Sequence, residues 1–130
     1  MCVFCDRIAS GDLPLESELA AVFPDGFPVS PGHMLIVSRR HVADYFSLEA
    51  SEQAALWELA PAVKRLIERE HLPSGYNMGI NIGTRAGQTI EHVHLHVIPR
   101  YEGDVPDPRG GIRWVIPARA AYWAGERAKP

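Results

Sequence analysis

The sequence predicts an α+β domain with an antiparallel sheet of about five strands, one long helix and a short N-terminal helix. Three observations predict this class. Short apolar runs bounded by turn residues come first, a stretch with helical spacing lies in the middle, and further strand-like runs follow it. The connection between the first two strands is too short for a crossover helix, so these strands are expected to be antiparallel.

The first part of the chain predicts a short helix followed by two strands. Residues 3–9 indicate a helix that ends near Gly11. Residues 19–23 form an apolar run suited to a strand, and a turn-rich segment follows at residues 24–28. Residues 33–37 form the next apolar run. The two runs are therefore expected to make the first hairpin of the sheet.

The middle of the chain predicts the long helix, over residues 51–70. Ser51 is a suitable N-cap, and the acidic residue early and basic residues late suit the helix dipole. Pro61 lacks a backbone donor, so we expect the helix to kink or restart there. The helical spacing is carried by five apolar positions, Leu56, Leu59, Ala60, Val63 and Ile67.

Two further strands are expected after the helix, at residues 77–82 and 91–98, joined by a loop that contains glycines. The rest of the chain is rich in Pro, Gly and Arg, and only residues 113–116 within it have the composition of a strand. The length of 130 residues suits one domain and is too short for two. We therefore expect a single domain over residues 1–130, with a core at 2–101 and a C-terminal tail at 102–130.

The composition limits the possible partners. The net charge of −3 comes from 13 basic and 16 acidic residues, without a Lys/Arg-rich run, so we expect no nucleic acid polymer as partner. A local pocket can still bind a small phosphorylated substrate. The first residues lack the features of a signal peptide, and no apolar run approaches the roughly 20 residues that span a bilayer. A cytoplasmic protein without a membrane partner is the expectation.

The most informative segment of the chain is its last strong strand, in which three of the six histidines occur within five residues. Side chains alternate between the faces of a strand, so His92, His94 and His96 are expected on one face, with successive rings about 7 Å apart. The other face receives Val93, Leu95 and Val97 and is expected to enter the core.

Imidazole has an unperturbed pKa of about 6.5 and can act as nucleophile, base or acid near neutrality. A row of imidazoles suits phosphoryl or nucleotidyl transfer, in which one ring attacks phosphorus and its neighbours hold the anionic oxygens. Two plainer interpretations of the row remain, namely solvent-facing polar rings and a metal site.

The histidine strand resembles the signature of the histidine triad (HIT) family of nucleotide hydrolases and transferases. The resemblance covers roughly residues 2–101, and its motifs occur in the order that this family shows. They are Phe23-Pro24-Asp25, Ser30-Pro31-Gly32-His33, Ser38-Arg39-Arg40-His41, Asn81, and Gly87-Gln88-Thr89-Ile90 before His92-Val93-His94-Leu95-His96.

The resemblance implies a HIT-like fold and a covalent mechanism. The middle histidine of the family attacks the α-phosphorus and becomes a transient nucleotidyl-imidazole, which water then cleaves; this role falls to His94. The carbonyl of His92 is expected to orient the His94 ring, and His96 to donate to the phosphate oxygens. These three histidines are the expected catalytic residues.

The resemblance also implies a substrate-binding set. His33 is expected to help neutralise the phosphate charge, and Asn81, Gln88 and Thr89 to contact phosphate or leaving-group oxygens. Asp25 is expected to accept hydrogen bonds from the ribose hydroxyls. Each residue has a plainer alternative, because Asp25 suits a turn, Asn81 a sheet edge and Thr89 a strand. The base pocket is expected to be lined by Phe4, Ile8 and Phe23, which are otherwise core candidates.

The N-terminal pair Cys2 and Cys5 suggests metal chemistry. Zinc needs four ligands in a tetrahedron, and the other two could be His41 and His92. Some bacterial-type members of the family carry such a Cys2His2 site, which would be structural because protein ligands fill all four positions. The alternative is a pair of reduced buried cysteines beside two polar histidines. The expected cofactor is thus structural zinc, and no organic cofactor is implied.

The resemblance leaves the substrate open within one chemical class. Gln88-Thr89 before the histidines and Pro99-Arg100-Tyr101 after them favour the dinucleoside polyphosphate hydrolase branch, which cleaves substrates such as diadenosine tetraphosphate. The alternatives are an adenosine 5′-phosphoramidase of the Hint type, a nucleotidyl transferase and a non-catalytic nucleotide-binding module. The expected partners are a purine nucleotide of the AMP type and a second copy of the chain, in a homodimer whose sheets join.

Overall fold

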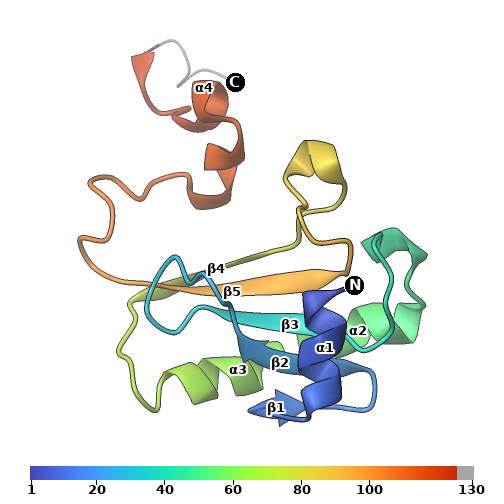
Figure 1. The fold of residues 1–130 in the computed structure, drawn as a ribbon. Helices are drawn as coiled ribbons and strands as arrows, with labels where there is room; N and C mark the ends of the chain where they lie inside the picture. The colour runs from blue at the N-terminus through green and yellow to red at the C-terminus, as the bar shows by residue number, and fades with distance from the viewer. Residues whose placement is uncertain (126–130) are drawn as a thin grey trace.

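The computed structural model describes residues 1–125; residues 126–130, the end of the expected tail, lie outside the described part. Its centre is a five-stranded sheet with the order β1-β2-β3-β5-β4, in which every neighbouring pair is antiparallel (Figure 1). The strands are β1 (Leu15–Glu16), β2 (Ala20–Pro24), β3 (Met34–Ser38), β4 (Gly75–Gly79) and β5 (His94–Arg100). The expected α+β class is confirmed.

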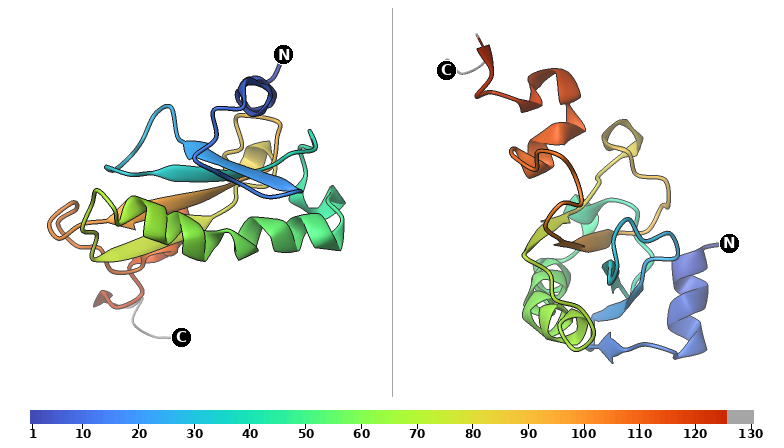
Figure 2. Two further views of the ribbon diagram at one scale, coloured as in Figure 1. Left: turned by 90° about the horizontal axis from the view of Figure 1, so that it is seen from below. Right: turned by 90° about the vertical axis from the view of Figure 1, so that its left-hand side faces the viewer.

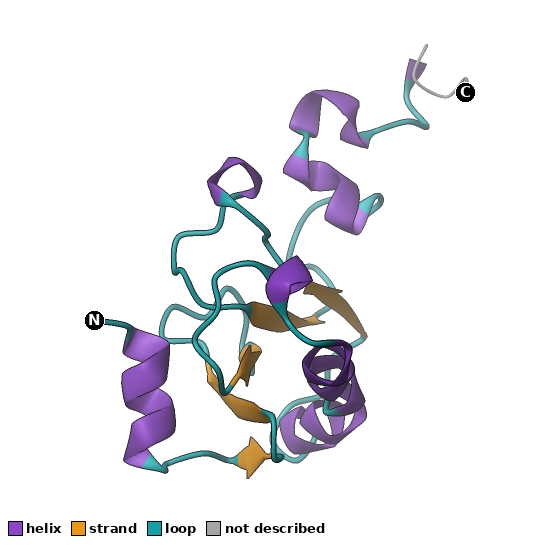
Figure 3. Cartoon of the chain, turned by 90° about the vertical axis from the view of Figure 1, so that its right-hand side faces the viewer, coloured by secondary structure: helices purple, strands orange, loops and turns teal. Residues whose placement is uncertain are grey.

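The helices lie on both faces of this sheet. The long helical segment is α2 (Ala50–Glu58) followed by α3 (Ala60–Ile67), and it covers one face, while α1 (Val3–Ser10) covers the other (Figure 2, left; Figure 3). None of the described helices is both long enough and apolar enough to cross a bilayer.

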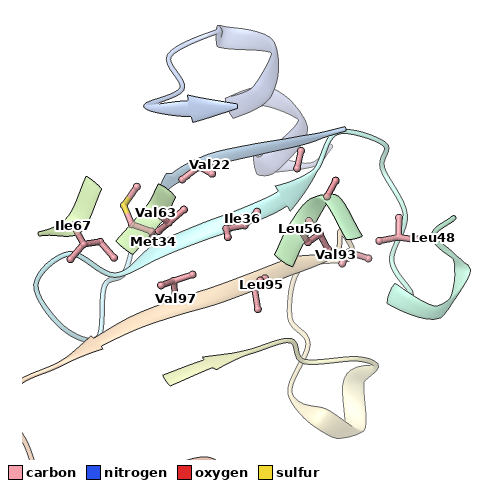
Figure 4. Packing of buried hydrophobic residues seen from close by; sticks show 12 residues of the cluster. Val22, Met34, Ile36, Leu48, Leu56, Val63, Ile67, Val93, Leu95 and Val97 are labelled. Carbon is pink, nitrogen blue, oxygen red and sulfur yellow. The ribbon is translucent and has the colours of Figure 1, made fainter. Parts of the chain in front are cut away.

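The main core fills the space between the sheet and the α2–α3 segment (Figure 4). Alternate strand residues point into it, because successive side chains of a strand face opposite sides. Each fully buried aliphatic side chain contributes about 1.5–3 kcal/mol. The packed residues include Val22, Ile36, Leu95 and Val97 from the strands and Leu56, Val63 and Ile67 from the helices.

The long helix is interrupted where the sequence predicts. Leu59 separates α2 from α3, and Pro61 lies in the first turn of α3, where its missing N–H costs no hydrogen bond. The expected N-cap at Ser51 is wrong. Glu49 is the N-cap, and its backbone N–H donates to the Glu52 carboxylate at 2.8 Å, which satisfies one of the free donors at this helix end.

Several strand limits also differ from the expectation. Strand β4 ends at Gly79 rather than at residue 82, and β5 begins at His94 rather than at residue 91. The shift in β5 arises because the backbone N–H of Val93 donates to the Val42 carbonyl, outside the strand ladder. The two-residue strand β1 was not expected, since two residues are too few for an alternation pattern.

The C-terminal segment extends away from the sheet (Figure 1; Figure 2, right). The strand expected at residues 113–116 is wrong, because Gly111–Val115 forms a 3-10 helix and α4 (Pro117–Ala120) follows it. Gly110 has φ +91° and Gly111 has φ +42°, which turns the chain out of an extended path. The guanidinium of Arg113 then donates to the carbonyls of Arg119 and Ala120, so this segment satisfies its own backbone groups.

Candidate active site and metal centre

Strand β5 presents His94 and His96 on the face of the sheet that α1 covers. In the ladder with β3, His94 pairs with Val37 and His96 with Leu35, and both partners belong to the small core under α1. Val93, Leu95 and Val97 point to the opposite core, as the alternation predicts. The His94 and His96 ring centroids are 5.0 Å apart rather than about 7 Å, and the planes of the two rings make an angle of 64°.

A backbone carbonyl fixes the protonation of the His94 ring. Nδ1 of His94 lies 2.8 Å from the His92 carbonyl oxygen. A carbonyl only accepts hydrogen bonds, so Nδ1 carries the proton of the neutral ring, and in that tautomer Nε2 has the lone pair. Nε2 has no hydrogen-bond partner among residues 1–125, and the ring forms part of a cavity wall. A neutral imidazole with a free nitrogen in a cavity is a competent nucleophile.

A chain of hydrogen bonds fixes the neighbouring rings. The backbone N–H of Val29 donates to His33 Nδ1 at 3.1 Å, which leaves the proton of a neutral His33 on Nε2. That N–H faces His96 Nδ1 at 3.0 Å, so His96 in turn carries its proton on Nε2. The chain from Val29 through His33 thus makes His96 Nε2 a donor.

Burial keeps these two rings neutral. Burial, together with the nearby His94 and His33, lowers the pKa of His96 to about 4, against the opposing effect of Asp25. Burial also lowers the pKa of His33. The Asp25 carboxylate lies 3.4 Å from His33 Nε2 and 3.9 Å from His96 Nδ1. Asp25, His33 and His96 could also group around a metal ion. The Val29 donor opposes this, because a neutral His33 then has no lone pair on the nitrogen that faces the group.

A cavity of about 490 Å³ opens beside these rings. One end is polar, with the histidines and Asp25, and the other is apolar. The Phe4 ring bridges the two ends, with its centroid 4.9 Å from that of His94 and 5.5 Å from that of Phe23. Among the expected binding residues, the cavity brings together Phe4, Phe23, Asp25, His33, Asn81 and Thr89 with His94 and His96.

Two of the expected binding residues lie elsewhere. The side chain of Gln88 accepts from the Gly83 N–H at 2.8 Å and donates to the carbonyls of Ala43 and Ile90, so it holds the loop before β5 and does not reach this cavity. Ile8 packs against the small core under α1. The cavity wall from α1 is formed instead by Val3, Phe4 and Arg7.

Arg7 was not expected at the site, although its spacing could have indicated it. Residues three and four apart share a helix face, so Phe4 has both Arg7 and Ile8 as neighbours on α1. The expectation of an apolar base pocket favoured Ile8 over Arg7 as the residue that lines it. In the structure, Arg7 is the one of the two that lies on the edge of α1 facing the cavity. Which edge faces the cavity depends on how the helix packs on the sheet.

Cys2, Cys5, His41 and His92 form a second cluster, whose ligand atoms all lie within 4.8 Å of one another. His92 Nδ1 lies 3.4 Å from Cys2 Sγ, 3.6 Å from Cys5 Sγ and 3.2 Å from His41 Nδ1. Tetrahedral zinc with Zn–N of about 2.0–2.1 Å and Zn–S of about 2.3 Å needs N···N and N···S separations of about 3.3–3.6 Å and an S···S separation of about 3.8 Å. The cluster therefore has the composition and the spacing of a zinc site.

Contacts around this cluster orient its ligands. His92 is fully buried, and its Nε2 lies 2.6 Å from the Ser38 carbonyl, which places the proton there and leaves the Nδ1 lone pair for the cluster. Cys2 is the N-cap of α1, and its sulfur accepts from the backbone N–H of Cys5 at 3.5 Å. Arg40, next to His41, makes a two-pronged ion pair with Glu52 at 2.8 and 3.0 Å and so ties this loop to α2.

Comparisons with known proteins identify the family of the chain. A profile of the HIT domain matches residues 9–103. An uncharacterized HIT-like protein of Mycoplasma genitalium is 38% identical over 105 residues, which cover 78% of this chain and 74% of the relative. The asymmetrical bis(5′-nucleosyl)-tetraphosphatase of Schizosaccharomyces pombe is 39% identical over 88 residues, which cover 68% of this chain and 48% of the relative.

Solved structures show the same likeness. The crystal structure of a Zn-bound histidine triad family protein from Mycobacterium smegmatis superposes with a TM-score of 0.69 and 32% identity, covering 90% of this chain and 91% of that chain. The matched profile spans well over half of the chain and includes β5 with its histidines. The chain therefore belongs to the HIT domain family.

Proposed function

We propose that this protein hydrolyses a nucleotide at its α-phosphorus through a covalent intermediate on His94, with a dinucleoside polyphosphate as the substrate class. One observation carries the proposal: the His92 carbonyl holds the proton on Nδ1 of His94 and leaves an unpartnered Nε2 in a cavity that can hold a nucleotide. Membership of the HIT family, which includes nucleotide-processing enzymes such as the S. pombe tetraphosphatase, supports it.

The first step forms a bond between His94 Nε2 and the α-phosphorus and breaks the bond between that phosphorus and the bridging oxygen. The bridging oxygen leaves with its electron pair as part of a nucleoside polyphosphate. The His94 ring then carries a positive charge, which the His92 carbonyl at 2.8 Å from Nδ1 stabilises. The His96 Nε2–H donates to a non-bridging oxygen, where negative charge grows in the transition state.

The second step is attack of water on the same phosphorus. An O–P bond forms while the P–N bond breaks, the electron pair of the P–N bond returns to Nε2, the water loses one proton to solvent, and a nucleoside 5′-monophosphate leaves. His94 thereby regains the protonation state with which it began. Thr89 and Asn81 line the cavity and are suited to hold phosphate or leaving-group oxygens during both steps.

The remaining groups of the cavity suit the rest of a nucleotide. One oxygen of Asp25 accepts from the Phe27 N–H at 2.8 Å, which fixes the carboxylate so that it can accept from ribose hydroxyls. The rings of Phe4 and Phe23 provide an apolar surface for a purine. The nucleotide is thus expected to lie along the cavity from the histidines to α1.

The test is product analysis with two substrates, diadenosine tetraphosphate and adenosine 5′-phosphoramidate, using the wild type beside His94→Ala. We expect AMP and ATP from the first substrate, faster than AMP from the second. A higher kcat/KM for the phosphoramidate would instead identify a Hint-type phosphoramidase. Retained AMP binding without turnover of either compound would identify a binding module and overturn the proposal.

We also propose that the cluster of Cys2, Cys5, His41 and His92 holds structural zinc. Four protein ligands would fill the tetrahedron, so the metal would crosslink α1, the loop after β3 and the segment before β5 without binding substrate. A reducing cytoplasm would keep both cysteines reduced and so available as ligands. Metal analysis of the purified protein tests this, with one zinc per chain as the expected result.

A homodimer is the expected assembly. Strand β4 is an edge of the sheet, and one side of its backbone has no strand partner among the described residues. We propose that two copies pair in the region of this strand, as the family resemblance implies. Mass measurement by light scattering after size exclusion tests the assembly state, and a monomer at micromolar concentration would contradict it.

A further inference from the structure

Arg7 gives the apolar end of the cavity a permanent positive charge. It lies on α1 three residues after Phe4, and its Cζ is 5.4 Å from the centroid of the Phe23 ring. Among the described residues that line the cavity, it is the one that stays charged at every physiological pH, since the others able to carry a positive charge are histidines. Stacking on Phe23 restricts the guanidinium to one orientation against the cavity wall.

The donors of this guanidinium lack good partners in the chain. Nε is buried and has no hydrogen-bond partner among residues 1–125. The nearest carboxylate, of Asp12, is 4.0 Å away and its side chain is 88% exposed, so this ion pair is weak. An arginine presents five N–H donors in a rigid plane. Nε itself is buried, so the donors that can meet a ligand beside this apolar surface are the terminal N–H groups of a side chain that is 39% exposed.

The chemistry of the purine edge decides whether these donors meet hydrogen-bond acceptors. Guanine and hypoxanthine present two neighbouring acceptors, O6 and N7, which match the fork of an arginine. Adenine presents N7 beside an amino group at position 6, and that group is a donor, which leaves one prong of the fork unpaired or repelled. The fork therefore distinguishes the two kinds of purine.

We propose that Arg7 makes the site prefer nucleotides of 6-oxopurines, guanine or hypoxanthine, over those of adenine. The inference rests on the proposed function for the position of the base in the cavity, and it refines the AMP type of substrate that the family resemblance implies. A guanidinium that donates to both O6 and N7 is expected to give roughly a 10- to 100-fold higher affinity for a 6-oxopurine nucleotide than for an adenine nucleotide.

The test is the binding of GMP, IMP and AMP, measured by titration calorimetry, which needs no turnover. The wild type is expected to bind GMP and IMP at least about tenfold more tightly than AMP. Arg7→Met, which keeps a long apolar side chain, is expected to bind the three with similar affinity. Arg7→Lys keeps the charge without the fork and is expected to lose most of the preference.

Arg65→Met is the matched control, because Arg65 lies exposed on α3, away from the cavity, and this variant is expected to keep the preference. Thermal melting of each variant establishes that it is folded. Equal binding of GMP and AMP by the wild type would overturn the inference, as would a preference that survives Arg7→Met. A uniform loss of affinity in Arg7→Met would also overturn it, since that result identifies a phosphate contact.

The outcome is separable from that of the proposed function. If the wild type binds GMP more tightly than AMP but turns over neither guanine nor adenine dinucleoside polyphosphates, the hydrolase proposal fails and the role of Arg7 stands. If it turns over both kinds of substrate equally and binds both mononucleotides equally, the hydrolase proposal stands and the role of Arg7 fails.

Discussion

The two histidine clusters of this protein are close in space, yet the structure prepares them for different chemistry. His92 in the candidate metal centre and His94 in the candidate active site are two residues apart, and each donates one ring N–H to a backbone carbonyl. His92 uses Nε2, towards Ser38, and His94 uses Nδ1, towards His92 itself. The lone pair of His92 therefore faces two sulfurs and the imidazole of His41, whereas that of His94 faces an open cavity.

The difference teaches that the partner of one ring nitrogen decides the use of the other. It also shows that the clusters are linked, since His92 belongs to the metal centre through its side chain and to the active site through its carbonyl. Variants of the Cys2–Cys5–His41–His92 cluster are expected to change mainly stability, and variants of the His94 cluster mainly catalysis. A change in the first cluster is also expected to affect catalysis to a smaller extent, through His92.

The largest effect is expected from His94→Ala. Removing the nucleophile is expected to lower kcat by at least about 10³-fold while the affinity for a nucleoside monophosphate changes little, because a nucleophile acts chiefly in the transition state. Single-turnover kinetics and calorimetry measure the two quantities. Unchanged kcat in this variant would end the assignment of His94.

The next effect is expected from His41→Ala, which removes an exposed ligand of the metal centre. The zinc content is expected to fall, and the free energy of unfolding to drop by at least about 2 kcal/mol, because metal binding is coupled to folding. A fall in kcat smaller than that of His94→Ala is expected, through misorientation of His92. In calorimetric melting, a chelator is expected to lower the Tm of the wild type and leave that of His41→Ala unchanged.

A smaller effect is expected from acid. Because burial lowers the pKa of His96 to about 4, the folded protein binds fewer protons at this ring than the unfolded chain between pH 6.5 and 4. This ring therefore lowers stability as pH falls through that window and has no such effect above it. Melting at pH 7 and pH 5 is expected to show a smaller pH-induced loss in His96→Gln than in the wild type, and equal losses would contradict this.

The smallest effect is expected from Glu52→Gln. The Arg40 guanidinium holds the pKa of the Glu52 carboxyl below its usual range, and this pair ties the His41 loop to α2. An amide keeps the shape but loses the charge, so we expect a loss of about 1–2 kcal/mol of stability with zinc content and kcat almost unchanged. Urea unfolding measures it. A large fall in kcat would show that the loop reaches the active site more directly.

The sequence predicted those features that depend on local patterns. Alternation in β5 placed Val93, Leu95 and Val97 in the core, and Pro61 marked the restart of the helix. The order of motifs shared with the family predicted that Asp25, His33 and Asn81 lie near the histidines, and all three line the cavity beside His94 and His96. The family resemblance also named the four members of the possible metal site, which come from three separate segments and lie together in the structure.

Other features depend on contacts between distant segments and could not be predicted. The proton position on His96 follows from the Val29 N–H through His33, a chain that no spacing reveals. The side chain of Gln88 makes its hydrogen bonds to backbone groups of its own loop and of Ala43. The choice of Arg7 over Ile8 as a cavity wall depends on the rotation of α1 against the sheet.

The most direct test of the central claim is the stereochemistry at phosphorus. A substrate made chiral at the α-phosphorus with sulfur is hydrolysed in water enriched in oxygen-18, and the configuration of the product is determined. Attack by His94 and then by water inverts the phosphorus twice, so this account predicts retention. Inversion would mean a single direct attack by water and would contradict the covalent role of His94.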